Sequence, residues 1–442
     1  MKIQISENFT YKKLLRFTFP SIFMMIFTSI YGVVDGVFVS NFVGKTPFAA
    51  INLIMPVYMV LGSLGFMVGT GGSALVSKLL GEGKTERAGA VFSLLIYSSF
   101  VFGAVFATAA FFLIGPISVA LGAKGEMLQD CILYGRILLP FIPIYILQNE
   151  FQSFLVAAER PKLGLWITVA AGCTNIFLDA LFVGVFPFGL AGAAVATAIS
   201  QFVGGVIPLV YFVRSKKSVL RLGRTRFDGG ALIKACANGS SEMMANLSSC
   251  VVNILYNFRL MQLAGEDGLA AYGVIMYVNF IFMAVFFGYA VGSSPVISYH
   301  YGAGNTQEIK SLKKKSLVIV ALSAVAMTAL AEGLAYPLAK LFVGYDSQLF
   351  SMTVRGFMLY SLSFLVMGFN IFGSSFFTAL NNGGVSAIIS FLRTFAFQIL
   401  AIYLLPELLA LDGIWLAIVF AELLSIAVTV FFFVTQRSRY GY

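Results

Sequence analysis

The sequence predicts an all-α polytopic membrane protein with twelve transmembrane helices arranged as two parallel six-helix repeats. Three observations support this fold class, and the first is composition. Of the 442 residues, 59% are hydrophobic and only 11% are charged, with a mean hydropathy of +0.91, whereas a soluble domain is typically ~45–50% apolar and ~25% charged. The second is a series of long apolar runs, and the third is a similarity between the two halves. Together they exclude a soluble array of domains, a disordered chain and a disulfide scaffold.

A helix needs ~20 mostly apolar residues to cross the hydrocarbon core of a bilayer, and loops separate twelve such runs. The first run is too long for a cleavable signal peptide, so we interpret it as the first membrane span. The predicted spans of the first half are 14–40, 51–77, 89–113, 132–156, 164–186 and 189–213. The predicted spans of the second half are 231–260, 269–299, 315–337, 356–378, 385–405 and 412–434.

The basic residues predict how these spans are oriented. Twenty-two of the 29 Lys and Arg residues lie in the termini and the even-numbered loops, and six lie on the opposite side. Because basic loops stay in the cytoplasm, we expect both termini to be cytoplasmic and the protein to be a multi-pass protein of the cell (plasma) membrane. The basic run 214–226 lies between two apolar helices, so we interpret it as a topology and headgroup signal and expect no nucleic acid partner.

The two halves of the chain match when one is shifted by 221 residues. Residues 48–55 then fall on 269–276, with four of eight positions identical. Residues 81–86 fall on 302–307, with both glycines retained. The matches share one offset and lie in equivalent segments, which indicates a genuine internal repeat.

This repeat sets the expected domain organisation. Each half contains an even number of spans, so the two halves enter the membrane in the same direction. We expect an N-terminal lobe over 1–213, a basic cytoplasmic linker over 214–230 and a C-terminal lobe over 231–442. Two lobes with a cleft between them suit alternating access, in which one lobe rocks against the other.

A group of polar residues falls at overlapping depths in the outer half of the first lobe. Asp35 lies ~31 Å along the first helix, Asp179 ~22 Å along the fifth, and Thr197 ~12 Å below the outer end of the sixth, at 1.5 Å per residue. Asn175 shares a helix face with Asp179. Carboxylate, amide and hydroxyl oxygens suit Na⁺, and two close carboxylates can retain a proton. The spacing leaves a shared H⁺ or Na⁺ site and two independent acids equally open.

The repeat favours a shared site in one lobe only. At the offset of 221, Asp35 falls on Tyr256 and Thr197 falls on Ile418, so the polar group is not duplicated although the fold is. Because ionisable groups inside a membrane are costly, they normally have a function. An asymmetric coupling-cation site in the first lobe is the better explanation.

Several other polar residues lie within the spans, and their roles are more open. Glu242, with Asn246 and Asn253, either lines a central cavity or makes hydrogen bonds between helices. The candidate residues of a substrate cavity are Glu242, Asn246, Gln148, Gln201 and Asn253.

Three further expectations concern structure rather than substrate. The polar stretch around Glu150 lies near a cytoplasmic helix end, so solvation is the simpler expectation. Glu422, which occupies the position of Gln201 in the repeat, is expected to form a buried ion pair with Arg393. Pro20 is expected to kink the first helix.

The segments 32–56 (GVVDGVFVSNFVGKTPFAAINLIMP), 175–183 (NIFLDALFV) and 189–201 (GLAGAAVATAISQ) resemble the multidrug and toxic compound extrusion (MATE) family. The segment 238–249 (NGSSEMMANLSS) is most similar to its MepA-like and DinF-like bacterial branches. The resemblance covers nearly the whole chain and implies a MATE-type fold.

The resemblance also implies a function. It implies an antiporter that exports lipophilic organic cations in exchange for H⁺ or Na⁺, with no other cofactor and a monomeric state. It places the cation site at Asp35, Asn175, Asp179 and Thr197 and a conformational hinge at Pro20. Other branches use a glutamate further along the seventh helix. Here Ser249 lies nearer that place than Glu242 does.

Two alternatives compete with this export function. A lipid-linked saccharide flippase of the same superfamily would bind an anionic pyrophosphate, yet only Arg393 lies well inside a span. A membrane-embedded enzyme needs a nucleophile with its base or paired metal ligands, and the sequence offers neither arrangement. We therefore do not expect an enzyme.

Overall fold

The computed structural model describes residues 3–215 and 218–442, and this part of the chain contains helices and loops but no β-strand. The helices of the first half are α1 (Tyr11–Phe42), α2 (Lys45–Gly81), α3 (Thr85–Ala120), α4 (Gly125–Leu138), η1 (Leu139–Phe141), α5 (Ile142–Ala157), α6 (Pro161–Asp179), η2 (Ala180–Val185) and α7 (Gly189–Arg214). Those of the second half are α8 (Gly229–Gly302), α9 (Thr306–Val343), α10 (Ser347–Ser361), α11 (Phe364–Ala379), α12 (Gly383–Phe391), η3 (Leu392–Ala396), α13 (Phe397–Thr435) and α14 (Arg437–Tyr440).

These helices provide the twelve membrane crossings that the hydropathy predicts. Within the described ranges, nine helical segments are long and apolar enough to cross a membrane, and the pair α10–α11, bent by 45°, gives a tenth. The 74-residue α8 reverses direction at Gly265, and the continuous segment Gly383–Thr435 reverses at Ala410. Each of these two segments therefore contributes two crossings, which confirms the prediction of twelve.

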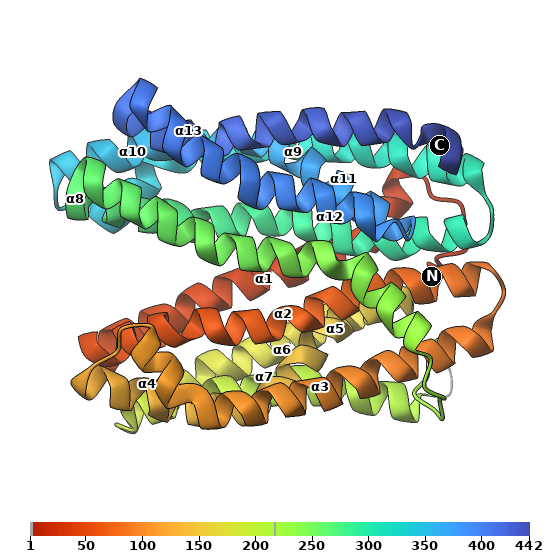
Figure 1. Cartoon of the computed structure of the whole chain (residues 1–442), viewed down its shortest axis with the longest axis horizontal. Helices are drawn as coiled ribbons and strands as arrows, with labels where there is room; N and C mark the ends of the chain where they lie inside the picture. The colour runs from red at the N-terminus through yellow and green to blue at the C-terminus, as the bar shows by residue number, and fades with distance from the viewer. Residues whose placement is uncertain (1–2, 216–217) are drawn as a thin grey trace.

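The helices form two bundles that lie side by side (Figure 1). We call α1–α7 the N-terminal bundle and α8–α13 the C-terminal bundle. Both chain ends lie at the same end of the molecule, which we call the terminus end. The segment that joins the bundles comes after α7 in the chain and lies against α3. The Gly223 amide donates to Ser93 Oγ, and the Thr225 hydroxyl donates to the Ala90 carbonyl. Asp228 then caps the start of α8 by accepting from the Ala231 amide at 3.0 Å.

The backbone confirms the internal repeat. Residues with a positive φ angle, at which helices end or bend, recur at the same spacing in both halves. The pairs are Gly44 with Gly265, Gly83 with Gly304, Gly189 with Ala410, and Glu159 with Asn381. The first three pairs are 221 residues apart and the last is 222 apart, so the one-residue shift found in the sequence also appears in the backbone. Ala410 has φ 51°, a conformation that costs a residue with a Cβ more than it costs glycine.

The bundles meet at the terminus end through glycines that let the helices touch backbone to backbone. A Cβ on Gly81 would collide with the carbonyl oxygen of Tyr299, and a Cβ on Gly302 would collide with that of Lys78. Gly81 and Lys78 correspond to Gly302 and Tyr299 in the 221-residue repeat, so each contact is the repeat equivalent of the other. The interface is therefore itself pseudo-symmetric. The glycines of this interface, which we call the glycine seam, are Gly71, Gly81, Gly239, Gly288, Gly292 and Gly302.

The N-terminal segment crosses the same end of the molecule and binds both bundles. The Ile5 amide donates to Glu159 of the N-terminal bundle at 3.1 Å. The Phe9 amide donates to Glu308 of the C-terminal bundle at 2.9 Å, and Lys315 donates to the Phe9 carbonyl. This segment therefore adds hydrogen bonds to the contacts that hold the two bundles together.

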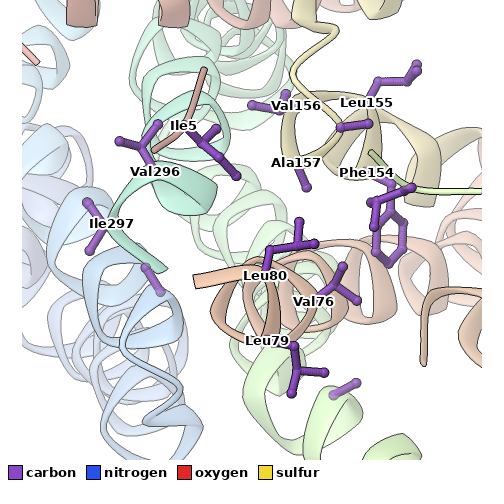
Figure 2. Packing of buried hydrophobic residues seen from close by; sticks show 14 of the residues in the cluster. Ile5, Val76, Leu79, Leu80, Phe154, Leu155, Val156, Ala157, Val296 and Ile297 are labelled. Carbon is purple, nitrogen blue, oxygen red and sulfur yellow. The ribbon is translucent and has the colours of Figure 1, made fainter. Parts of the chain in front are cut away.

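A hydrophobic core shared by both bundles lies beneath this segment. Figure 2 shows Ile5 beside Val296 of α8, with side chains of α2 and α5 nearby. Ile5 is 2% exposed and Val296 is fully buried. Burial of an aliphatic side chain contributes about 1.5–3 kcal/mol, so the closed terminus end is held by apolar packing as well as by the seam.

The glycine seam leads to a first testable prediction. We expect Gly239→Ala to push the bundles apart at the terminus end, because the added Cβ would collide with the Met67 carbonyl oxygen. The measurement is the rate of thiol labelling of a cysteine placed at Ser298, which is buried at the same interface, with the four native cysteines replaced. Labelling should rise several-fold.

Gly333→Ala is the matched control for this prediction. A Cβ at Gly333 meets nothing within 4 Å, so labelling should stay at the parent rate. Equal labelling in both variants would contradict the proposed role of the seam.

Candidate functional site

Two acidic side chains from different helices meet inside the N-terminal bundle. Asp35 comes from α1, while Asn175 and Asp179 come from one face of α6. Helix α6 ends at Asp179, and a π-helical turn follows over Ala180–Val185. Such turns are rare and are found frequently at functional sites. The local backbone therefore presents Asp179 at a point where regular helix geometry changes.

The two carboxylates are close together, and their polar atoms are not satisfied by protein groups. The Asp35 side chain neighbours those of Asp179 and Asn175. Asp179 is fully buried and Asn175 is 2% exposed. Even so, Oδ1 of Asp35, both carboxylate oxygens of Asp179 and Nδ2 of Asn175 are buried without a hydrogen-bond partner. Two ionised carboxylates cannot donate to each other, so the pair needs a shared proton or a bound cation.

Two further side chains complete this group. Tyr134 of α4 lies close to both carboxylates and to Thr197 on α7. We call Asp35, Tyr134, Asn175, Asp179 and Thr197 the carboxylate cluster. The structure thus brings together all four residues that the sequence proposed for a cation site, and it adds a tyrosine.

The carboxylate cluster fits a proton or a small hard cation. It offers carboxylate, amide and hydroxyl oxygens, and acceptors exceed donors. Within the described ranges, no group of three His, Cys, Asp or Glu side chains could hold a metal ion. A cation in this cluster would therefore depend on the amide and hydroxyl oxygens beside the two acids. An unpaired buried charge is costly, so a bound H⁺ or Na⁺ would stabilise this arrangement.

A layer of tyrosines next to the cluster was not anticipated from the sequence. Tyr58 donates to Gln201 at 2.5 Å, and its ring stacks on Tyr145 with centroids 4.9 Å apart. Tyr31 lies close to Asp35 and Tyr145. These residues carry a hydroxyl inside otherwise apolar spans, which is the signal that could have identified them. The layer places polar atoms beside the carboxylates without adding charge.

The residues predicted to line a substrate cavity do not form one group. Gln148 packs against Gly204 of α7, inside the N-terminal bundle. Asn246 donates to the Glu242 carbonyl within α8. Asn253 donates to the Ser249 carbonyl and accepts from the Tyr272 hydroxyl at 2.8 Å.

Glu242 occupies a different place from these residues. It lines a small cavity of about 20 Å³ between the two bundles, together with side chains of α2, α5 and α11. This cavity is far smaller than a drug-sized pocket of roughly 300–1,000 Å³.

Two expectations about buried charge have opposite outcomes. The Arg393–Glu422 ion pair is confirmed: Nε of Arg393 lies 2.8 Å from Oε1 of Glu422, and the side chains are 6% and 1% exposed. The expectation that Glu150 is solvated is wrong, because Glu150 is fully buried and neither of its carboxylate oxygens has a partner. The cause is packing that hydropathy does not reveal, since α2 approaches so closely that Gly69 abuts the Glu150 backbone.

Pro20 lies inside α1, which continues as one helix from Tyr11 to Phe42. It borders a surface pocket that also contains Arg16 and Arg160. A role as a hinge stays a prediction.

Comparisons with known proteins agree with this architecture. The family model described as MatE matches residues 20–181 and 242–404. The multidrug export protein MepA of Staphylococcus saprophyticus is 24% identical over 369 residues, which cover 82% of this chain and 81% of that protein. The multidrug export protein MepA of Staphylococcus haemolyticus is 23% identical over 434 residues, covering 98% and 95%.

A solved structure has the same fold. It is described as the outward-facing conformation of a multidrug resistance MATE family transporter of the MOP superfamily. It superposes with a TM-score of 0.91 at 23% identity and covers 99% of this chain and 97% of that one. The two matched segments of the family model lie in the two halves of the chain, in agreement with the duplicated backbone.

Proposed function

The chain belongs to the MatE family, and from this premise we propose that it is a secondary active exporter of small organic cations. Efflux of the substrate is coupled to inward movement of H⁺ or Na⁺, without chemical conversion of the substrate. The moving units are an N-terminal lobe over 1–213 and a C-terminal lobe over 231–442, joined by the linker 214–230. The protein acts as a monomer in the plasma membrane.

The observation that carries this proposal is the carboxylate cluster. Its acidic oxygens are buried and lack hydrogen-bond partners, so the cluster is stable only when it holds a proton or a cation. Taking up a cation from one side of the membrane and releasing it to the other would link the ion gradient to the exchange of conformations. The coupling site therefore comprises Asp35, Asn175, Asp179 and Thr197, with Tyr134 as an additional partner.

The substrate class follows from the curated relatives and from charge. Both MepA relatives are named as multidrug export proteins. The acidic side chains of Glu242 and of the carboxylate cluster would attract lipophilic cations, and the many aromatic and methionine side chains would accept varied shapes. Glu242, Asn246, Gln148, Gln201 and Asn253 remain the proposed polar residues of the substrate path, and because they do not form one group, each would contact the substrate at a different point along it.

The glycine seam supports alternating access. The basic residues favour a cytoplasmic location for the terminus end, and this is the end at which the bundles touch backbone to backbone. In this arrangement the path is closed to the cytoplasm. Rocking of one lobe would separate the seam and open the path inward.

A flippase of the same superfamily is disfavoured by one contact. An anionic pyrophosphate requires free guanidinium or ammonium groups in the path. Arg393, the basic residue placed deepest in a predicted span, is already paired with Glu422 at 2.8 Å.

The test of the proposed function is dye efflux from proteoliposomes that contain the purified protein. A pH gradient and a Na⁺ gradient are imposed separately, and movement of a fluorescent lipophilic cation is recorded. Transport should follow at least one of the two gradients. Transport of the dye that follows neither gradient, or no transport at all, would contradict the proposal.

A further inference from the structure

A small polar cavity lies between the two bundles and contains the Glu242 side chain. Its volume is about 20 Å³, which is close to the ~10–15 Å³ that one water molecule needs by this measure. Six hydroxyl-bearing residues line it, three from each bundle: Thr70, Ser73, Ser153, Ser294, Ser375 and Thr378. Apart from Glu242, its other lining residues are Phe287, Ala290 and Val291. The cavity therefore holds one acid, surrounded by hydroxyl oxygens from both sides of the interface.

Most of these hydroxyls offer acceptors rather than donors to the cavity. The Thr70 hydroxyl donates to the Phe66 carbonyl at 2.9 Å, and the Ser73 hydroxyl donates to the Thr70 carbonyl at 3.1 Å. On the other side, the Ser375 hydroxyl donates to the Ala290 carbonyl at 3.4 Å. A hydroxyl whose proton is used in this way keeps only its lone pairs for other partners.

The two remaining hydroxyls of the C-terminal bundle differ in this respect. The Thr378 hydroxyl has acceptors at the Asn238 carbonyl, 3.4 Å away, and at Ser386, 2.7 Å away. Ser294 Oγ is buried without a hydrogen-bond partner. Four of the six hydroxyls thus use their protons elsewhere, so lone pairs outnumber free hydroxyl protons around the carboxylate.

The negative charge of Glu242 is not balanced by a protein cation. The basic group whose charge attracts the Glu242 carboxylate is Arg393. The guanidinium of Arg393, however, forms an ion pair with Glu422 at 2.8 Å. Among the ion pairs of the described residues, none includes Glu242. A carboxylate among acceptor oxygens is a setting that a bound cation stabilises.

We propose that Glu242 and the hydroxyls around it form a monovalent-cation site, for which Na⁺ is the probe, distinct from the carboxylate cluster and built from both bundles. One carboxylate balances one positive charge, and the volume admits a single small ion. Glu242, Ser294, Ser375 and Thr378 come from the C-terminal bundle, whereas Thr70, Ser73 and Ser153 come from the N-terminal bundle. The site is complete only when the bundles are in contact.

This geometry gives the site a defined effect on conformation. This effect rests on the proposed function in one respect: the bundles must separate at the terminus end during transport. Separation removes the three oxygens of α2 and α5 from the four residues of α8 and α11. An ion that binds only the assembled site stabilises the closed terminus end. Cytoplasmic Na⁺ at this site would thus hold the transporter closed to the cytoplasm.

The first experiment measures heat stability of the purified protein as Na⁺ replaces choline at constant ionic strength. In the parent protein Na⁺ should raise the melting temperature by several degrees. Glu242→Gln keeps the size and removes the charge, and it should lose most of this rise. Asp35→Asn is the matched control in the other cluster and should keep a clear Na⁺ response. A Na⁺ response in Glu242→Gln as large as that of the parent protein would overturn the proposal, as would no response in the parent.

The second experiment reports on conformation. Lys78 and Tyr301 are in contact across the bundles, with Nζ 5.1 Å from the ring centroid, so a cysteine pair at these positions, with the native cysteines replaced, should crosslink when the terminus end is closed. Na⁺ should speed crosslinking several-fold in an otherwise unchanged protein. Glu242→Gln should abolish the Na⁺ effect, and Ser153→Ala should require several-fold more Na⁺ for the same effect. If gradient-driven dye efflux occurs but Na⁺ leaves crosslinking unchanged, this inference fails while the proposed function stands.

Discussion

Asp35→Asn and Asp179→Asn are each expected to reduce gradient-driven efflux of a cationic dye to the level of empty proteoliposomes. Asparagine keeps the size of the side chain but cannot carry the negative charge that binds a proton or Na⁺. Because the two carboxylates are neighbours in one cluster, losing either one removes half of the charge of the cluster. The measurement is the initial rate of dye movement under the gradient that drives the parent protein.

The design must separate loss of coupling from loss of folding. An amide can donate to the remaining carboxylate, which has at least one buried oxygen without a partner, so both variants should melt at or above the temperature of the parent protein. Glu126→Gln, at an exposed position on α4, is the matched control and should transport normally. Normal efflux by both aspartate variants would show that the carboxylate cluster is not the coupling site.

The second large effect is expected for the ion pair of the C-terminal bundle. Glu422→Ala leaves the Arg393 guanidinium buried without its partner, and removal of one member of a buried pair costs about 3–5 kcal/mol. Glu422 also accepts from Asn370 Nδ2 at 2.7 Å, and Asn370 accepts from the Thr429 hydroxyl at 2.8 Å. The change therefore disturbs a connected network and should lower the melting temperature strongly.

A double substitution tests whether charge is the cause. Replacing both partners with apolar residues of similar size, as in Arg393→Met with Glu422→Leu, removes the pair without leaving a buried charge. This double variant should be clearly more stable than Glu422→Ala. Melting temperatures of the single and double variants give the comparison. Equal losses in both would indicate that packing, rather than the uncompensated charge, sets the stability.

Much of the architecture could be predicted because hydropathy and repetition are properties of local sequence. The apolar runs located all twelve crossings, and the 221-residue offset reappears in pairs of residues with a positive φ angle, such as Gly83 and Gly304. The ion pair of Arg393 and Glu422 was also predictable, since a charge deep in a span requires a partner. For the candidate site, depth along each helix was enough to suggest that Asp35 and Asp179 are neighbours.

Other features depended on how the helices are rotated and how closely they pack. Glu150 is near a helix end, yet close contact with α2 buries it fully. Glu242 shares a helix with Asn246, but only Glu242 lines the cavity between the bundles. Rotation and distance are set by side chains on neighbouring helices, which no single segment specifies.

The sequence by itself determined the class of protein, the number of crossings, the duplication and the presence of acids within the membrane. Each of these follows from the cost of placing a polar group or a short apolar segment in lipid, and that cost is local. Only the tertiary structure decided which polar atoms face each other: Tyr134 beside the carboxylate cluster, and hydroxyls of both bundles around Glu242. The physical reason is that hydrogen bonds and ion binding require atoms a few ångströms apart. Helix packing brings together residues hundreds of positions apart in the chain.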